Sequence, residues 1–116
     1  MDETPPNELL IVWTSADADI ARNMVLLYAA NAMLNRWWDQ INIIVWGSSA
    51  KLIAEHGDIR DEVAQLIELG VLVMACQECA DSYGLTKDFK SLGIDIFFTG
   101  SFLTEWVKSG KPHLTF

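Results

Sequence analysis

The chain has 116 residues, which is enough for one domain with a single hydrophobic core. Hydrophobic residues make up 51% of it, which excludes a disordered chain; the net charge of −8, with eight scattered Lys and Arg, argues against binding to nucleic acid. No apolar stretch approaches the roughly 20 residues that span a bilayer, and the acidic, proline-broken start does not resemble a signal peptide. We therefore expect a cytoplasmic protein with reduced thiols that binds neither nucleic acid nor membrane.

The first part of the chain predicts a flexible leader over residues 1–7, followed by a strand and a long helix. Residues 8–13 contain an unbroken apolar run, which is typical of a strand buried on both faces in a parallel sheet. Residues 14–17 then provide loop and N-cap chemistry for a helix over about 17–36. The apolar residues that recur near the helical period are Ile20, Met24, Leu27 and Leu34.

The middle of the chain continues the alternation of strand and helix. Residues 41–46 predict the second strand, and the Gly-Ser-Ser turn at 47–49 leads into a helix over 50–55. Asp58 is expected to cap the next helix, which Gly70 ends. The buried stripe expected on that helix is Ile59, Val63, Leu66 and Ile67.

The last part of the chain repeats the pattern and ends on a strand of undetermined direction. In order, we expect a strand at 71–75, a helix to about Tyr83, a helical turn within 85–92, a strand at 94–98, a helix over 99–108 and a strand at 112–116. This strand–helix alternation predicts a single α/β domain over residues 8–116, with a mostly parallel sheet and helices on both faces.

In open parallel sheets, functional groups gather where the strands end at their carboxyl side. Small and polar residues follow the predicted strands at this edge. The candidate site-lining residues are Ser15, Gly47, Ser48, Ser49, Thr99, Gly100 and Ser101. The hydroxyl groups after the second and fourth strands could donate hydrogen bonds to an anion, although N-capping is their favoured role.

The chain has two cysteines, Cys76 and Cys79, directly after the third predicted strand. Backbone N–H groups converge at a helix N-terminus and favour a thiolate there, and the spacing lets the second thiol reach a sulfur carried by the first. Glu78 and Asp81 oppose thiolate formation, and no basic residue is nearer in sequence than Lys87. Positive charge would therefore have to come from another segment or another subunit.

The residues alone leave several interpretations of this pair open. The thiols could simply pack a strand–helix junction. A zinc site would need His56 and His113, which lack zinc-finger spacing. A thioredoxin-like redox pair normally follows an early strand, and sulfur transfer is the remaining interpretation. No nucleotide-binding or Gly-x-Ser-x-Gly motif occurs, so neither a cofactor nor a hydrolase is indicated.

The chain resembles the DsrE-like family of sulfur-relay proteins, which includes the TusD and YchN proteins. The segments that carry the resemblance are residues 9–15, 29–32, 45–53, 70–84, 99–101 and 114–116. The resemblance implies a three-layer α/β/α domain with a five-stranded sheet. It also implies that Cys76 accepts a persulfide sulfur and passes it to a partner protein, with Cys79 as an additional thiol.

Assembly is a further expectation from the resemblance, which implies a homotrimer or homohexamer. Five tryptophans are many for this length, and the adjacent Trp37 and Trp38 mark either an interface or the cap of the core at a helix end. We expect the active thiol to lie near a subunit boundary. The alternatives to a sulfur carrier are a non-catalytic oligomeric scaffold or binding module and a Cys-x-x-Cys thiol redox protein.

Overall fold

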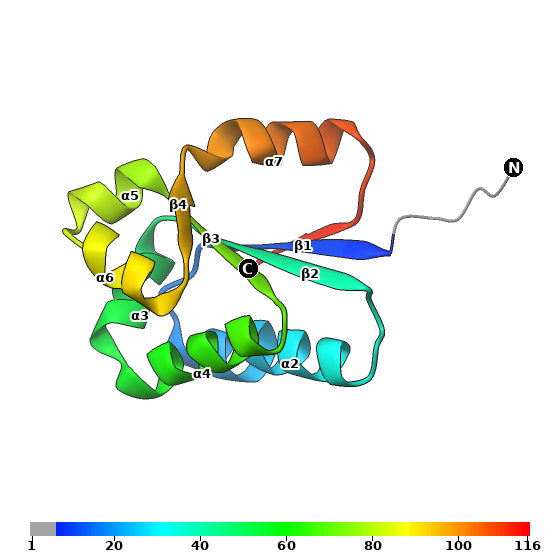
Figure 1. Cartoon of the computed structure of the whole chain (residues 1–116), viewed down its shortest axis with the longest axis horizontal. Coiled ribbons are helices and arrows are strands. Elements are labelled where there is room, and N and C mark those ends of the chain that lie inside the picture. The colour runs from blue at the N-terminus through cyan, green and yellow to red at the C-terminus, as the bar shows by residue number, and fades with distance from the viewer. Residues whose placement is uncertain (1–6) are drawn as a thin grey trace, which may run out of the picture.

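The computed structural model describes residues 7–116, and in it five strands form one parallel sheet in the order β4-β3-β2-β1-β5 (Figure 1). The strands are β1 (Glu8–Trp13), β2 (Gln40–Val45), β3 (Leu72–Cys76), β4 (Asp95–Phe97) and β5 (His113–Thr115). The predicted mostly parallel, five-stranded sheet is confirmed. The last strand, whose direction was undetermined, runs parallel to β1.

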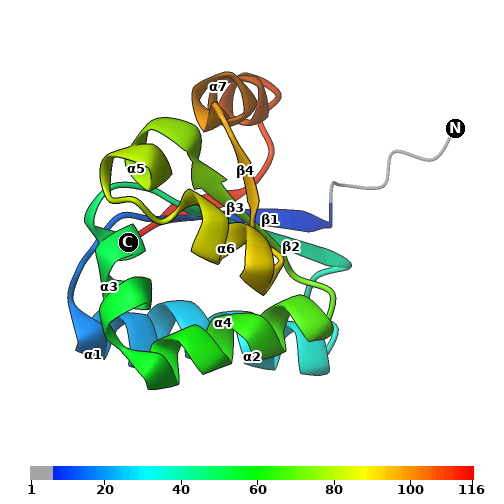
Figure 2. The same ribbon diagram turned by 60° about the vertical axis from the view of Figure 1, so that its left-hand side comes forward.

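Helices cover both faces of the sheet, as predicted. They are α1 (Ala18–Ile20), the π-helical η1 (Ala21–Val25), α2 (Leu26–Leu34), α3 (Ser48–Glu55), α4 (Gly57–Glu68), α5 (Gln77–Ser82), α6 (Thr86–Leu92) and α7 (Thr99–Lys108). In Figures 1 and 2, α2, α3 and α4 lie on one side of the sheet and α7 on the other, while α5 and α6 lie beside the β4 edge. No helix within residues 7–116 is long and apolar enough to cross a membrane.

Alternate residues of β1 enter two separate cores, which explains why its apolar run is unbroken. Leu9, Ile11 and Trp13 join the large cluster beneath α2 and α4, whereas Leu10 and Val12 join the smaller cluster beneath α7. All five are buried. A strand with helices on both sides must be apolar at nearly every position. This requirement explains the unbroken apolar run in the sequence of β1.

The long first helix forms, but its predicted apolar stripe is wrong. Ile20, Met24, Leu27 and Leu34 are exposed, by 67% in the case of Leu34. The buried face consists instead of Ala21, Val25, Leu26, Ala29 and Ala32. Small alanines let this helix approach the sheet closely, and the π-helical turn η1 shifts the side-chain period. Sequence periodicity therefore identified the helix and misassigned its buried face.

Of the two helix caps expected at Asp17 and Asp58, one is confirmed and one is wrong. Asp17 caps the first helix as expected, since its carboxylate accepts hydrogen bonds from two backbone N–H groups of the first turn. Asp58 does not cap α4, because the N-cap residue is His56. Asp58 instead pairs with Arg22 across 2.7 Å, and the hydrogen bond from this guanidinium lowers the pKa of Asp58.

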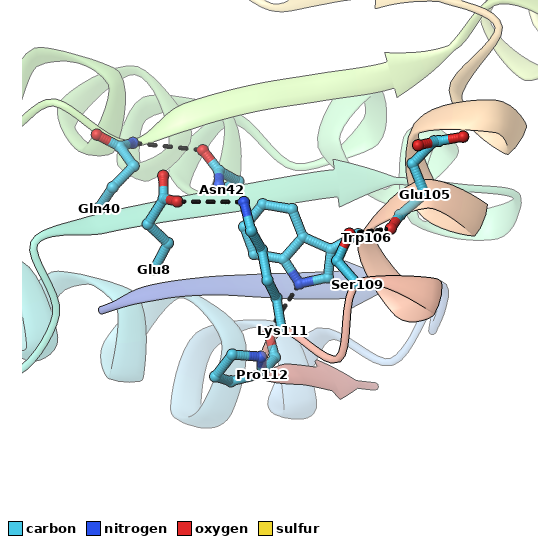
Figure 3. A network of polar contacts seen from close by, with 8 residues as sticks. All are labelled: Glu8, Gln40, Asn42, Glu105, Trp106, Ser109, Lys111 and Pro112. Atoms are coloured by element: carbon cyan, nitrogen blue, oxygen red, sulfur yellow. Dashed lines mark hydrogen bonds and ion pairs between the residues drawn. The ribbon is translucent and has the colours of Figure 1, made fainter. Parts of the chain in front are cut away.

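Polar contacts join α7 to the segment before β5 and, through it, to β1 (Figure 3). The indole Nε1 of Trp106 donates a 2.9 Å hydrogen bond to the carbonyl of Pro112. The Lys111 ammonium lies 4.6 Å from the centre of the Trp106 ring and 3.4 Å from the Glu8 carboxylate. The expected leader lies outside the described residues except for Asn7, whose carbonyl accepts a hydrogen bond from the Asp39 N–H.

Candidate functional site

The two cysteines lie at the carboxyl edge of the sheet. Cys76 is the last residue of β3 and also the N-cap residue of α5, and Cys79 is the third residue of that helix. Both are free thiols. Parallel strands place all their carboxyl ends at one edge, so the residues after β2 and β4 lie on either side of this pair.

Cys76 is only 7% exposed, yet it lines a pocket of about 300 Å³. The pocket residues come from the ends of β2, β3 and β4 and from the starts of α5 and α7. They are Trp46, Cys76, Glu78, Phe98, Thr99, Gly100 and Ser101. A thiol that is mostly shielded from bulk water but open to a small cavity can react with a small molecule while its product is protected.

Cys79 is half-buried and is held by the loop that follows β2. The Gly47 N–H donates a hydrogen bond to Cys79 Sγ across 3.4 Å. Burial raises the pKa of Cys79, and the Cys76 thiol and the Glu78 carboxylate raise it further; the Gly47 hydrogen bond acts in the opposite direction. The balance of these effects favours the protonated thiol at Cys79.

Of the two acidic neighbours expected to oppose a thiolate, one is turned away. The Asp81 carboxylate accepts hydrogen bonds from Thr86 at 2.5 Å and from Gln77 at 3.1 Å, and these bonds lower the pKa of Asp81. They tie α5 to the start of α6. Glu78 is thus the carboxylate that raises the pKa of Cys79, and it also lines the pocket.

None of the three candidate serines, Ser15, Ser48 and Ser49, is the N-cap residue of the helix beside it. The N-cap residue of α3 is Gly47, at φ +68°, and no side chain caps it, so the predicted capping role of Ser48 and Ser49 is wrong. The buried Ser49 hydroxyl lies 2.5 Å from the Trp13 carbonyl and 3.1 Å from that of Trp46. Ser48 is exposed, and Ser15 Oγ accepts a 3.0 Å hydrogen bond from the N–H of Asp17.

The start of α7 is also uncapped, which contradicts the N-capping role expected for Thr99 and Ser101. The N-cap residue is Phe98, whose side chain makes no capping bond. Thr99 is fully buried, and its Oγ1 is the one buried side-chain polar atom in residues 7–116 that lacks a hydrogen-bond partner. Gly100 and Ser101 are exposed at the pocket mouth.

The aromatic and acidic walls of the pocket were not predicted as site residues. Trp46 and Phe98 immediately follow strands β2 and β4, and Phe98 is 64% exposed. An aromatic residue directly before an uncapped helix is the signal that could have identified Phe98, because Ser, Thr, Asp or Asn normally stands there.

The histidines considered for zinc do not join the cysteines. His56 precedes α4 and His113 lies in β5. Within the described residues, no three His, Cys, Asp or Glu side chains gather where they could hold a metal ion. The four-ligand arrangement is therefore not assembled here.

Trp37 and Trp38 lie in the loop that leads from α2 into the amino end of β2, whereas the thiols lie at and after the carboxyl end of β3. Trp38 packs against the core and donates a 3.0 Å hydrogen bond to the Tyr28 hydroxyl. Trp37 is 53% exposed. Trp38 thus caps the core at the helix end, and only Trp37 is available to a partner.

A family model described as the DsrE/DsrF-like family matches residues 8–116. Among solved structures, the conserved protein of unknown function BT1422 from Bacteroides thetaiotaomicron is 35% identical, with a TM-score of 0.92 and 95% of each chain covered. The protein of unknown function MTH1491 from Methanobacterium thermoautotrophicum is 17% identical, with a TM-score of 0.71, over 93% of this chain and 97% of that one. The ychN protein from E. coli is 18% identical, with a TM-score of 0.70, over 97% and 100%. A search of curated proteins finds no match.

Proposed function

The chain belongs to the DsrE/DsrF-like family, and from this premise we propose that it is a cytoplasmic sulfur carrier that holds a persulfide on Cys76 and passes it to a partner protein. The observation that carries the proposal is the position of Cys76, almost buried at the end of β3 yet lining a cavity of about 300 Å³. A carrier needs a thiol that a donor can reach and a space that shields the added sulfur from water.

The neighbouring thiol supports this role because of its protonation state. If Cys79 were a thiolate, it would attack the Cys76 persulfide, form a Cys76–Cys79 disulfide and release hydrosulfide. Burial and the adjacent charges raise the pKa of Cys79, which slows this side reaction. The protonated Cys79 can also donate a weak hydrogen bond to a neighbouring sulfur anion.

Assembly into a homotrimer or homohexamer is part of the proposal. Phe98 is 64% exposed at the rim of the pocket, and a large exposed aromatic beside a reactive group is suited to a subunit or partner boundary. A neighbouring subunit or a donor protein seated there would cover Cys76. It could also supply the positive charge that the residues around the thiols lack.

The test is sulfur uptake from a persulfide donor, followed by intact-mass analysis. Wild-type protein should gain one sulfur, Cys76→Ser should gain none, and the matched variant Cys79→Ser should still gain it. Uptake by Cys76→Ser at the wild-type rate would show that Cys76 is not the carrier.

A non-catalytic oligomeric module is the second candidate, and the outer face of the first helix favours it. Four apolar residues are exposed there, namely Ile20, Met24, Leu27 and Leu34. This function would need no reactive thiol. Slow alkylation of Cys76 near neutral pH, together with an assembly disrupted by Leu27→Glu and Leu34→Glu, would favour it over the carrier.

A further inference from the structure

The residues that line the Cys76 pocket include hydrogen-bond donors that have no acceptor in the protein. The first N–H groups of any α-helix lack intrahelical partners, and no side chain caps α7, a ten-residue helix. Thr99, the first residue of α7, is fully buried in the pocket wall with an unpartnered hydroxyl. A buried polar group without a partner is costly, and a ligand oxygen would remove that cost.

These donors favour a negatively charged group that lies close to the Cys76 thiol. Helix N-termini attract negative charge through their N–H groups and dipole, and a threonine hydroxyl can add a further hydrogen bond. The donors share a pocket of about 300 Å³ with the Cys76 thiol, so the anion would be one end of a small molecule whose other part reaches the sulfur.

Apart from Cys76 and the start of α7, the residues that line the pocket are acidic or aromatic. They indicate a positively charged group on the same molecule. Glu78 is exposed and acidic, while Trp46 and Phe98 are aromatic. Carboxylates and aromatic faces both attract an ammonium group. A molecule with a carboxylate, an ammonium group and sulfur is an amino acid of the cysteine type.

Building on the sulfur-carrier function, we propose that this pocket binds a small amino-acid persulfide of the cysteine persulfide class as sulfur donor. The ligand carboxylate accepts hydrogen bonds from the α7 N-terminus and from Thr99 Oγ1, once a rotation of the Thr99 side chain turns this buried hydroxyl toward the pocket. Its ammonium group lies toward Glu78, and its sulfur chain points to Cys76. Thr99 thereby becomes a substrate-binding residue for the sulfur carrier.

The transfer step balances without any further reactant. The Cys76 thiolate attacks the outer sulfur of the donor R–S–SH and forms a new S–S bond. The donor S–S bond breaks, and its electron pair leaves on the inner sulfur as the thiolate R–S⁻. The hydrogen on the outer sulfur stays with it, so the products are Cys76–S–SH and the thiolate of the amino acid, with no net oxidation or reduction.

The binding test uses three unreactive probes that differ by one group, with affinity measured by calorimetry. S-methyl-L-cysteine has both charges, 2-(methylthio)ethylamine lacks the carboxylate, and 3-(methylthio)propionate lacks the ammonium group. We expect S-methyl-L-cysteine to bind most tightly and the amine most weakly. Because a hydrogen bond to a charged group contributes about 1.5–3 kcal/mol, Thr99→Val should weaken both carboxylate probes about tenfold or more.

The controls separate binding from folding. Thr99→Ser keeps the hydroxyl and should restore affinity. Thr104→Val makes the same substitution on α7 at a residue that is exposed, donates to the Gly100 carbonyl and lies outside the pocket, so it should leave affinity unchanged. Without ligand, Thr99→Val should melt no lower than wild type, since it removes an unpartnered hydroxyl. Glu78→Gln should weaken the binding of S-methyl-L-cysteine by about twofold to fivefold. It should leave the affinity for 3-(methylthio)propionate unchanged.

Several results would overturn the proposal. Absence of S-methyl-L-cysteine binding at millimolar concentration, equal binding of the amine, or unchanged affinity in Thr99→Val would each exclude carboxylate recognition at Thr99. The sulfur-carrier function is judged separately, by uptake of sulfur on Cys76 from inorganic polysulfide. If that uptake occurs while the amino-acid probes do not bind, the sulfur-carrier function is retained. The proposal that an amino-acid persulfide is the donor is then wrong.

Discussion

Replacing Ser49 by alanine tests how the edge of the sheet is built. The Ser49 hydroxyl is buried within 2.5 Å of the Trp13 carbonyl and 3.1 Å of the Trp46 carbonyl. It therefore links the ends of β1 and β2 to the first turn of α3. The same turn contains Gly47, whose N–H holds Cys79 Sγ. Ser49→Ala should lower stability and loosen the loop beside the thiols.

The size of the effect follows from what the alanine leaves behind. A buried acceptor that loses its partner costs about 1–3 kcal/mol. The Trp13 carbonyl keeps a second donor, the Trp46 N–H at 3.0 Å, so the upper part of this range does not apply. We expect Ser49→Ala to lower the free energy of unfolding by about 1–2 kcal/mol, a fall in Tm of roughly 3–8 °C for a domain of this size.

The neighbouring serine provides the matched control. Ser48 is exposed, and surface substitutions of this kind change stability by at most about 0.5 kcal/mol. Urea unfolding at one fixed protein concentration, followed by tryptophan fluorescence, compares the two variants with wild type. The reasoning is refuted if Ser49→Ala and Ser48→Ala unfold at the same urea concentration.

Three further outcomes follow from the same structure. Because burial raises the pKa of Cys79, iodoacetamide at pH 8 should label it more slowly than it labels free cysteine, and peptide mass spectrometry showing equal rates would contradict this. Mild oxidation should convert the Cys76 and Cys79 thiols to a disulfide, so two thiols still titratable after prolonged oxidation would exclude a readily formed bond. The Arg60 guanidinium lowers the pKa of Asp88, so this ion pair stabilises the fold above about pH 4 and is lost as pH falls through the lowered value. For a half-exposed pair, Asp88→Asn should cost about 0.2–1 kcal/mol at pH 7 and less as the pH falls below about 4 in urea unfolding; a loss that does not change with pH would rule out the pair as its source.

The sheet was predictable because burial on both faces leaves a strong pattern in the sequence. Every strand lies within one residue of its predicted limits, and β1 shows why, with Ile11 and Val12 each buried in a different core. The first helix was harder, since its buried face depends on alanines rather than on large residues. Ala29 packs against the sheet while Leu34 is exposed, a reversal that hydrophobicity alone does not reveal.

The site was predictable in position but not in detail. The strand–helix alternation placed Cys76 and Thr99 at the same edge, because parallel strands share a carboxyl end. Capping roles were assigned from residue type, and the structure uses those residues otherwise: Ser49 binds strand-end carbonyls and Thr99 has no partner. Such differences depend on distances between segments far apart in the sequence, which local patterns do not encode.

At the carboxyl edge of the sheet, the hydrogen-bond donors beside the two cysteines are backbone N–H groups rather than basic side chains. Arg22, Arg60 and Lys111 are engaged in ion pairs with Asp58, Asp88 and Glu8, respectively. The Gly47 N–H instead reaches Cys79 Sγ, and the uncapped start of α7 faces the pocket beside Cys76. N–H groups fixed by the fold hold an anion without the conformational entropy that a lysine side chain would lose. A protein with a net charge of −8 can in this way offer a site for an anion, such as the carboxylate of the proposed ligand, at one edge of its sheet.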